Sequence, residues 1–119
     1  MPRRLTPEDP TLVEAAVERF LGGEPDRADL RLLTKHFLAL LAEKAPGGSV
    51  EVRVPPYAVV QCVEGTRHTR GTPPAVVETD ATTWIALALG DLKWADADAD
   101  GQVRASGERS DLSALLPLI

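Results

Sequence analysis

The spacing of apolar residues changes near residue 45 of this chain, and that change restricts the folds the chain can adopt. Up to about residue 45, apolar side chains recur every three or four positions, which is the period of an amphipathic helix. From Val50 to Val54, valines alternate with Glu51 and Arg53, which is the period of a half-buried strand. Helices followed by a run of strands are typical of an α+β domain.

Two helices are predicted before the change in period. The first covers about residues 11–21 and ends at two consecutive glycines. The second begins after Asp26, a residue type that caps helix N-termini, and continues to about residue 45, where proline and glycine follow. Residues 1–10 are rich in proline and charge, so we expect them to form a flexible tail.

The rest of the chain is predicted to alternate between strands and short helices. A buried helix is expected between Asp80, its cap, and Gly90, its stop. A short helix or turn should lie within residues 91–99, and a helical turn should begin at Ser110 or Asp111. Strands are expected at residues 50–54, 57–63, 75–79 and 102–106. We therefore predict one domain, residues 1–119, with N-terminal helices at 11–45 and with the sheet and C-terminal helices at 50–119. Its sheet should be mostly antiparallel, with four to five strands, and covered by helices on one face.

Charge and hydropathy exclude several classes of function. The chain has 13 Lys+Arg against 18 Asp+Glu, a formal net charge of −5, and no basic block, so nucleic acid is an unfavourable partner. Its longest nearly apolar stretch, residues 84–89, is far shorter than the roughly 20 residues that cross a bilayer. The N-terminus lacks the apolar region of a secretory signal. We expect a cytoplasmic protein with no integral membrane segment.

Candidate chemical groups are few. Cys62, the single cysteine, lies in an apolar run and is predicted to be a buried hydrophobe. His36 is predicted to lie on a helix flank, because no second metal-ligand type lies four residues away. Asp96, Asp98 and Asp100 match the first half of a calcium loop, but its twelfth position is occupied by glycine and not by the bidentate glutamate. We therefore predict an acidic turn, no metal and no cofactor.

Catalytic motifs are also missing from the sequence. No serine lies in a nucleophile elbow, and neither the dinucleotide fingerprint nor the P-loop pattern is present. Triads are spatial arrangements, so a missing motif does not exclude one. With two histidines in ordinary surroundings, we predict that the protein is not an enzyme.

Two segments carry a family resemblance. One is Val59–Asp80, which contains His-Thr-Arg-Gly-Thr-Pro-Pro and is followed by Trp84 and Gly90; the other is Gly101–Gly107 with the Asp-Leu-Ser-Ala-Leu-Leu-Pro that follows it at 111–117. They resemble the bacterial, actinobacterial-type branch of the sterol carrier protein family. The resemblance covers residues 50–118 well, and the N-terminal helices by position and pattern only.

This resemblance implies an α/β layer whose helices and curved sheet enclose an apolar tunnel for lipids or acyl chains, without a cofactor. The expected function is non-enzymatic binding of a fatty acyl or lipid-like small molecule in an internal cavity. The alternative is a closed module that docks on a partner enzyme or self-associates, for example as a homodimer. The residues predicted to bind the ligand are Val59, Arg67, His68, Arg70, Trp84, Leu87, Ala88, Trp94 and Leu116.

Several of these residues have a second interpretation. Trp84, on a helix with almost no polar face, fills the core or lines a pocket. Arg67, His68 and Arg70 form a solvated loop or a polar mouth that meets a carboxylate or head group. At the chain end, Leu118 and Ile119 follow a proline that stops the last helix, so we expect them to turn back and cover the apolar interior close to Trp84.

Overall fold

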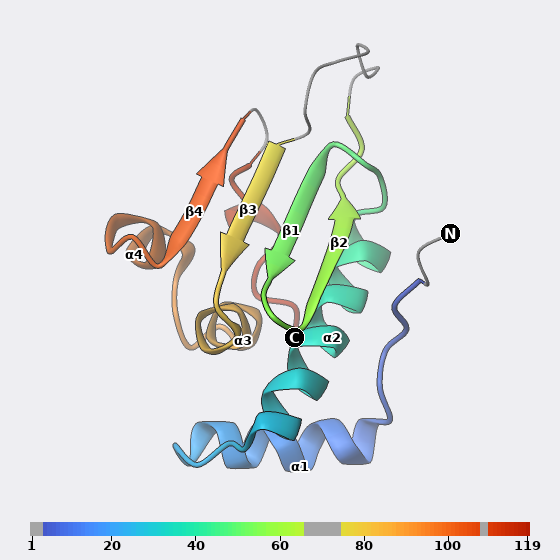
Figure 1. The fold of residues 1–119 in the computed structure, drawn as a ribbon, viewed down its shortest axis with the longest axis vertical. Helices are drawn as coiled ribbons and strands as arrows, with labels where there is room; N and C mark the ends of the chain where they lie inside the picture. The colour runs from blue at the N-terminus through green and yellow to red at the C-terminus, as the bar shows by residue number, and fades with distance from the viewer. Residues whose placement is uncertain (1–3, 66–74, 108–109) are drawn as a thin grey trace.

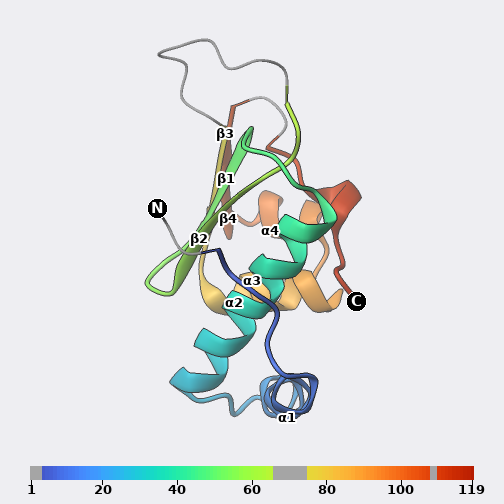
Figure 2. The same ribbon diagram turned by 90° about the vertical axis from the view of Figure 1, so that its right-hand side faces the viewer.

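The computed structural model describes residues 4–65, 75–107 and 110–119. Four strands form one sheet in the spatial order β2-β1-β3-β4 (Figure 1). The helices α2 and α3 cover one face of this sheet, and the other face is open (Figure 2). In the described residues the elements are α1 (Pro10–Leu21), α2 (Arg27–Lys44), β1 (Val50–Val54), β2 (Ala58–Cys62), β3 (Ala75–Thr79), α3 (Ala81–Leu89), α4 (Trp94–Ala99), β4 (Val103–Ser106) and the 3₁₀ turn η1 (Ser113–Leu115).

Aspartates begin the three longer helices, as local rules require. Asp9 accepts a hydrogen bond from the N–H of Thr11 at 2.8 Å at the start of α1. Asp26 forms a capping box with Asp29 at the start of α2. Asp80 accepts from the N–H of Thr83 at 2.8 Å at the start of α3. Each carboxylate satisfies an N–H that the helix itself leaves unpaired.

The sheet is mixed, which corrects the expectation of a mostly antiparallel sheet of four to five strands. The outer pairs, β1 with β2 and β3 with β4, are antiparallel, but the central pair β1 and β3 is parallel. The hairpin places β2 at an edge, and the chain then returns beyond β1 to form β3. β3 has the opposite direction to β2. Because β1 and β2 are antiparallel, β3 is parallel to β1. The described residues contain four strands and no fifth.

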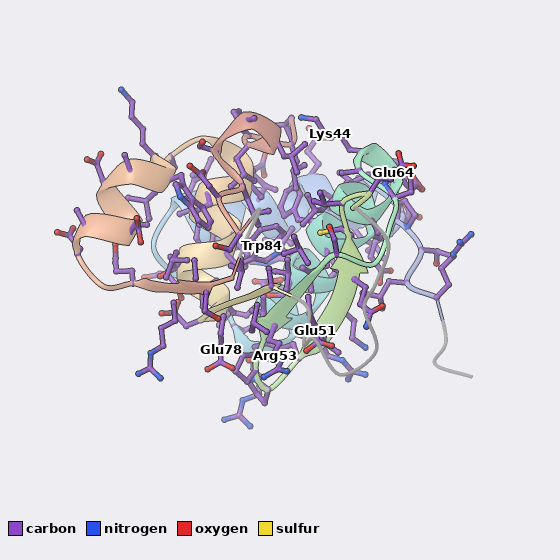
Figure 3. The ribbon with its side chains drawn as sticks, turned by 90° about the horizontal axis from the view of Figure 1, so that it is seen from above. Lys44, Glu51, Arg53, Glu64, Glu78 and Trp84 are labelled. Atoms are coloured by element: carbon purple, nitrogen blue, oxygen red, sulfur yellow. The ribbon has the colours of Figure 1, made fainter. Side chains whose placement is uncertain are left out.

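Alternation along the strands defines the core. Val50, Val52 and Val54 are fully buried against the helices, whereas Arg53 is exposed on the other face. From the helices, the largest fully buried side chains are Trp84, Phe37, Leu33, Leu38, Leu41, Ile85 and Leu87, and Leu112 joins them from the C-terminal segment. Figure 3 shows Trp84 between the sheet and the helices, and Glu51, Arg53 and Glu78 on the open side of the sheet.

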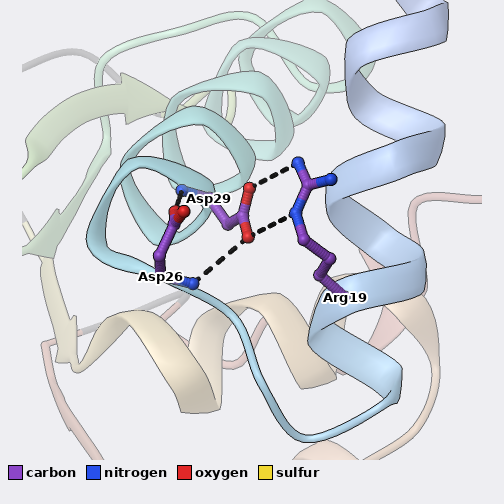
Figure 4. Close-up of polar contacts among 3 residues, drawn as sticks. All are labelled: Arg19, Asp26 and Asp29. Atoms are coloured by element: carbon purple, nitrogen blue, oxygen red, sulfur yellow. Dashed lines mark hydrogen bonds and ion pairs between the residues drawn. The ribbon is translucent and has the colours of Figure 1, made fainter.

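The N-terminal region lies against α2. α1 lies at one end of the molecule, beside the start of α2 (Figure 1). Arg19 of α1 donates two hydrogen bonds of 2.8 Å each to the carboxylate of Asp29, which is buried at the start of α2 (Figure 4). Further back, the N–H of Glu8 donates to Nδ1 of His36 at 3.0 Å, so residues 4–9, expected to be part of a flexible tail, are attached to α2.

Candidate ligand-binding site

The interior predicted to bind a ligand is built mainly on α3. Trp84, Leu87 and Ala88 lie on this helix and are at most 1% exposed. The indole Nε1 of Trp84 donates to the backbone oxygen of Thr34 on α2 at 3.3 Å, which fixes the ring between the two helices. Because α3 has an apolar sequence between two polar ends, nearly all of it is buried.

Two further predicted residues reach the same core. Trp94, the first residue of α4, is 8% exposed, and Leu116 is partly buried against the core cluster. The structure thus brings five of the predicted ligand-binding residues into one apolar cluster. Arg67, His68 and Arg70, the predicted polar mouth, lie outside the described residues.

Val59 lies on the opposite side of the sheet from that cluster. It is 52% exposed, and it pairs across the hairpin with Arg53, which faces the open side. Its strand neighbours Ala58, Val60 and Cys62 point toward the helices. The reason is the period of two along a strand, which places Val59 and Cys62 on different faces. Val59 instead lines a surface groove of about 410 Å³ beside Glu51, Arg53 and Glu78.

The C-terminal segment, residues 110–119, lies on the helix side of the sheet (Figure 2). Leu112 is fully buried, and the N–H of Leu118 donates to the backbone oxygen of Ala88 on α3 at 2.8 Å. From α2, Nζ of Lys44 donates to the backbone oxygen of Leu115 at 2.8 Å. The prediction that Leu118 turns back onto the body near α3 is confirmed. For Ile119 the prediction is wrong, because Ile119 ends the chain 74% exposed.

One polar atom in this interior has no partner. The side-chain hydroxyl of Thr34 is fully buried, and no hydrogen-bonding group of the described residues reaches it. The backbone oxygen of Thr34 is the acceptor for Trp84, so the free hydroxyl lies on the residue that positions the indole. Nothing in the sequence pattern singles out this threonine, because it is one of several polar residues on an amphipathic helix.

The remaining candidate groups have structural environments. Cys62 is fully buried in the core, as predicted, and burial raises the pKa of its thiol to about 11, so it is protonated at neutral pH. His36 lies on the flank of α2 with its ring 5.2 Å from that of Phe37, and burial lowers its pKa. Among the described residues, no group of three or more His, Cys, Asp or Glu is placed to hold a metal ion.

A larger hollow lies outside α2, away from the interior. It measures about 770 Å³ and runs between residues 27–35 of α2, the N-terminal segment and the turn after β1. Three of its lining side chains are cationic. We refer to it as the basic groove, lined by Glu8, Arg27, Arg31, Leu32, Lys35 and Tyr57, with Ala28 and Pro56. Its cations are four positions apart, so no run of consecutive basic residues marks the groove in the sequence.

Comparison with known families gives one match. A family model described as the bacterial SCP ortholog, where SCP denotes sterol carrier protein, matches residues 26–118. The chain belongs to this family. The match begins at Asp26, the cap of α2, and includes every element from α2 to η1, while α1 lies before it. No curated protein matches the chain.

Membership in the bacterial sterol carrier protein family suggests a lipid-carrier role at a coarse level. The match confirms the resemblance to bacterial sterol carrier proteins, and it includes α2 as well as residues 50–118; the actinobacterial-type branch stays a prediction. In the described part of the chain, no helix is both long enough and apolar enough to cross a membrane.

Proposed function

We propose that this protein binds a fatty acyl or related lipid-like molecule, without chemistry, in the apolar interior between the sheet and helices α2 and α3. The family supports a lipid-carrier role. The observation that carries the finer proposal is the set of apolar residues around Trp84 with the irregular C-terminal segment beside them. Trp84, Leu87, Ala88, Trp94 and Leu116 are the residues proposed to contact the ligand.

The C-terminal segment is the proposed entrance. Its only regular structure in the described residues is the three-residue turn η1, so few internal hydrogen bonds hold it in place. The bonds Leu118 to Ala88 and Lys44 to Leu115 join it to α3 and α2. Each such bond contributes about 0.5–1.5 kcal/mol net. Displacing the segment also exposes Leu112, which is fully buried, and burying such a side chain is worth about 1.5–3 kcal/mol, so this burial is part of the cost of opening.

The energy of a bound chain can offset this opening. Burying ten methylenes stabilises a complex by about 8 kcal/mol before ordering costs, at about 0.8 kcal/mol per methylene. Side chains such as Leu87 and Leu112 fill the interior in this structure, so binding requires them and the C-terminal segment to move. A ligand held in this way is selected by apolar volume and by very few polar contacts.

The hydroxyl of Thr34 is the proposed polar contact. It is buried without a partner in the described residues, on the same residue whose backbone oxygen holds Trp84. A buried hydroxyl without a partner loses about 1–3 kcal/mol of hydrogen bonding that water would supply. A carboxyl or hydroxyl group at the end of an acyl chain would restore that bond, and this would orient the chain.

A closed interaction module is the second candidate, and the packing of the core favours it. Twelve large side chains, including Trp84 and Phe37, are less than 2% exposed, so the interior is well filled as it stands. In this case the fold would act through its surface, by docking on a partner enzyme or by self-association.

Release of a fluorescent fatty acid, followed by tryptophan fluorescence in a stopped-flow instrument, distinguishes the two. For the proposed function, the probe binds saturably, and the Leu118→Ala variant releases it faster with a smaller loss of affinity. Ile119→Ala is the matched control, because its side chain is exposed, and it should release the probe at the unmodified rate. Absence of saturable binding to any of the three proteins would favour the closed module.

A further inference from the structure

Helix α2 carries a row of three cations on its outer side. Arg27, Arg31 and Lys35 follow one another at spacings of four residues, and all three line the basic groove. Side chains four residues apart lie next to each other on a helix surface. The row spans about 12 Å along the helix axis, at 1.5 Å per residue.

Nothing in the described part of the chain neutralises this row. Arg31 and Lys35 have no acidic residue three or four positions away on α2, and none of the three cations forms an ion pair with a described residue. Arg19 and Arg53, by contrast, are paired with Asp29 and Glu51. Like charges four residues apart destabilise a helix by a few tenths of a kcal/mol per pair. The row therefore costs some stability, and no ion pair with a described residue offsets that cost.

The other walls of the groove leave the positive charge in excess. Glu8 is the single acid among the lining residues, and its backbone N–H is held by His36. Leu32 and Tyr57 are half-buried and supply apolar surface beside the cations. The large apolar side chains that are exposed in the described residues, Leu12, Leu21, Val59 and Ile119, do not line the groove, so it offers no anchor for insertion into a bilayer.

We propose that the basic groove binds a soluble small molecule that carries two or more phosphate groups. Arginine guanidinium groups bind phosphate oxygens in a bidentate manner, and lysine adds a point charge. A row of about 12 Å lets the cations contact several phosphates of one ligand, while Tyr57 offers a ring face to its organic part. This site lies on the outside of α2 and does not depend on ligand binding in the interior.

Inorganic tripolyphosphate is the probe for this proposal. Its binding is measured by calorimetry at low salt and by amide chemical-shift changes on the full chain. We expect saturable binding, with shifts concentrated at residues 27–35 and Tyr57. The double variant Arg31→Gln with Lys35→Gln should weaken it about tenfold or more, since charge-assisted contacts are worth more than 1.4 kcal/mol.

A matched control removes the same net charge elsewhere. Lys93→Gln with Arg104→Gln changes two exposed cations beside α4 and on β4, the sheet edge opposite to β2. It should weaken binding by less than about twofold through the long-range field alone. Equal weakening by both double variants, no saturable binding, or shifts located elsewhere would overturn the proposal. Binding only to vesicles containing phosphatidylglycerol, with none to tripolyphosphate, would also overturn it and indicate a membrane surface.

Discussion

The hydroxyl of Thr34 gives two opposite effects at a single residue. In Thr34→Val the unpaired hydroxyl is replaced by a methyl group of similar size, so we expect the unfolding free energy to rise by about 1 kcal/mol. The same variant should bind a fatty acid more weakly if the hydroxyl contacts the ligand. Thermal melting and probe titration measure the two effects.

Thr79→Val is the control for this substitution. The hydroxyl of Thr79 is also buried, but it donates to the backbone oxygen of Gln102 at 2.7 Å. Thr79→Val removes this hydrogen bond, so stability should fall. If Thr34→Val also destabilises the protein, the hydroxyl has a partner in solution.

His36 predicts a pH dependence. Burial lowers its pKa from the ordinary value near 6.5, against the opposing charges of Glu8 and Glu43, and the fold therefore favours the neutral ring. Above pH 6.5 the folded and unfolded chains are both neutral at this group, and its full contribution to stability is present. Below pH 6.5 the unfolded chain takes up the proton first, so stability declines until the pH passes the folded pKa.

Melting between pH 7.5 and 5.5 measures this effect, over a range chosen as roughly one unit on either side of the ordinary histidine pKa. The melting temperature of the natural sequence should decrease as the pH is lowered, and that of His36→Gln should decrease less. Protonation would also abolish the acceptor for the N–H of Glu8, so the protection factor of the Glu8 amide, its exchange relative to the intrinsic rate at each pH, should fall over the same range. If the melting temperature of His36→Gln changes with pH as much as that of the natural sequence, His36 does not cause this pH dependence.

At the scale of elements, the joint between α1 and α2 combines one ion pair with apolar packing of α1 against the core. Asp29 is buried and accepts from Arg19 and from the N–H of Asp26 (Figure 4). The hydrogen bond from Arg19 is the first cause that lowers the pKa of Asp29, so this contribution is lost as pH falls through that lowered pKa. Asp29→Asn should lower the melting temperature and raise the hydrogen-exchange rate of α1.

An exposed pair provides the comparison. Arg53 and Glu51 also form an ion pair, but on the open face of the sheet, and such pairs contribute about 0–1 kcal/mol. Glu51→Gln should therefore melt nearly unchanged. A larger loss in Glu51→Gln than in Asp29→Asn would contradict the role given to the joint.

The C-terminal segment provides a second prediction at this scale. Leu118 is partly buried and bonded to Ala88, so Leu118→Ala should destabilise the fold by about 1 kcal/mol, less than a fully buried leucine would. Ile119→Ala should leave the melting temperature unchanged because its side chain is exposed. Chemical denaturation of the two variants measures the difference. Equal destabilisation would mean that Ile119 packs against the body or against a partner.

Local patterns in the sequence predict the helices and strands but not how these elements pack against one another. Caps identify the starts of α2 and α3, after Asp26 and Asp80, and the period identifies α1 and the four strands of the described residues. α4 has no side-chain cap, and the sequence predicts only a short helix or turn there. The parallel pairing of β1 with β3 depends on how the chain returns from β2, which no local pattern encodes. Val59 is apolar, but strand alternation relative to Cys62 places it on the face of the sheet away from Trp84. The ion pair between Arg19 and Asp29 could not be predicted, because it depends on how α1 packs against α2.

At the scale of the whole molecule, the two proposed sites lie on different sides of α2. The apolar interior lies between α2 and the sheet, and the basic groove lies on the outside of the helix. The basic groove depends on tertiary packing, because the N-terminal segment and the turn after β1 form its other walls beside the cation row of α2. Each site can fail without the other, since no lining residue of the groove belongs to the set proposed to contact the apolar ligand.

Native mass spectrometry of freshly purified protein tests the central claim most directly. If the interior binds an acyl chain, each protein molecule should carry one apolar ligand, either co-purified or added as a fatty acid. The fraction bound should fall in the Thr34→Val variant and be unchanged in Ile119→Ala. A spectrum that shows only the unliganded chain or its dimer, even with excess fatty acid, would contradict the account and favour the closed module.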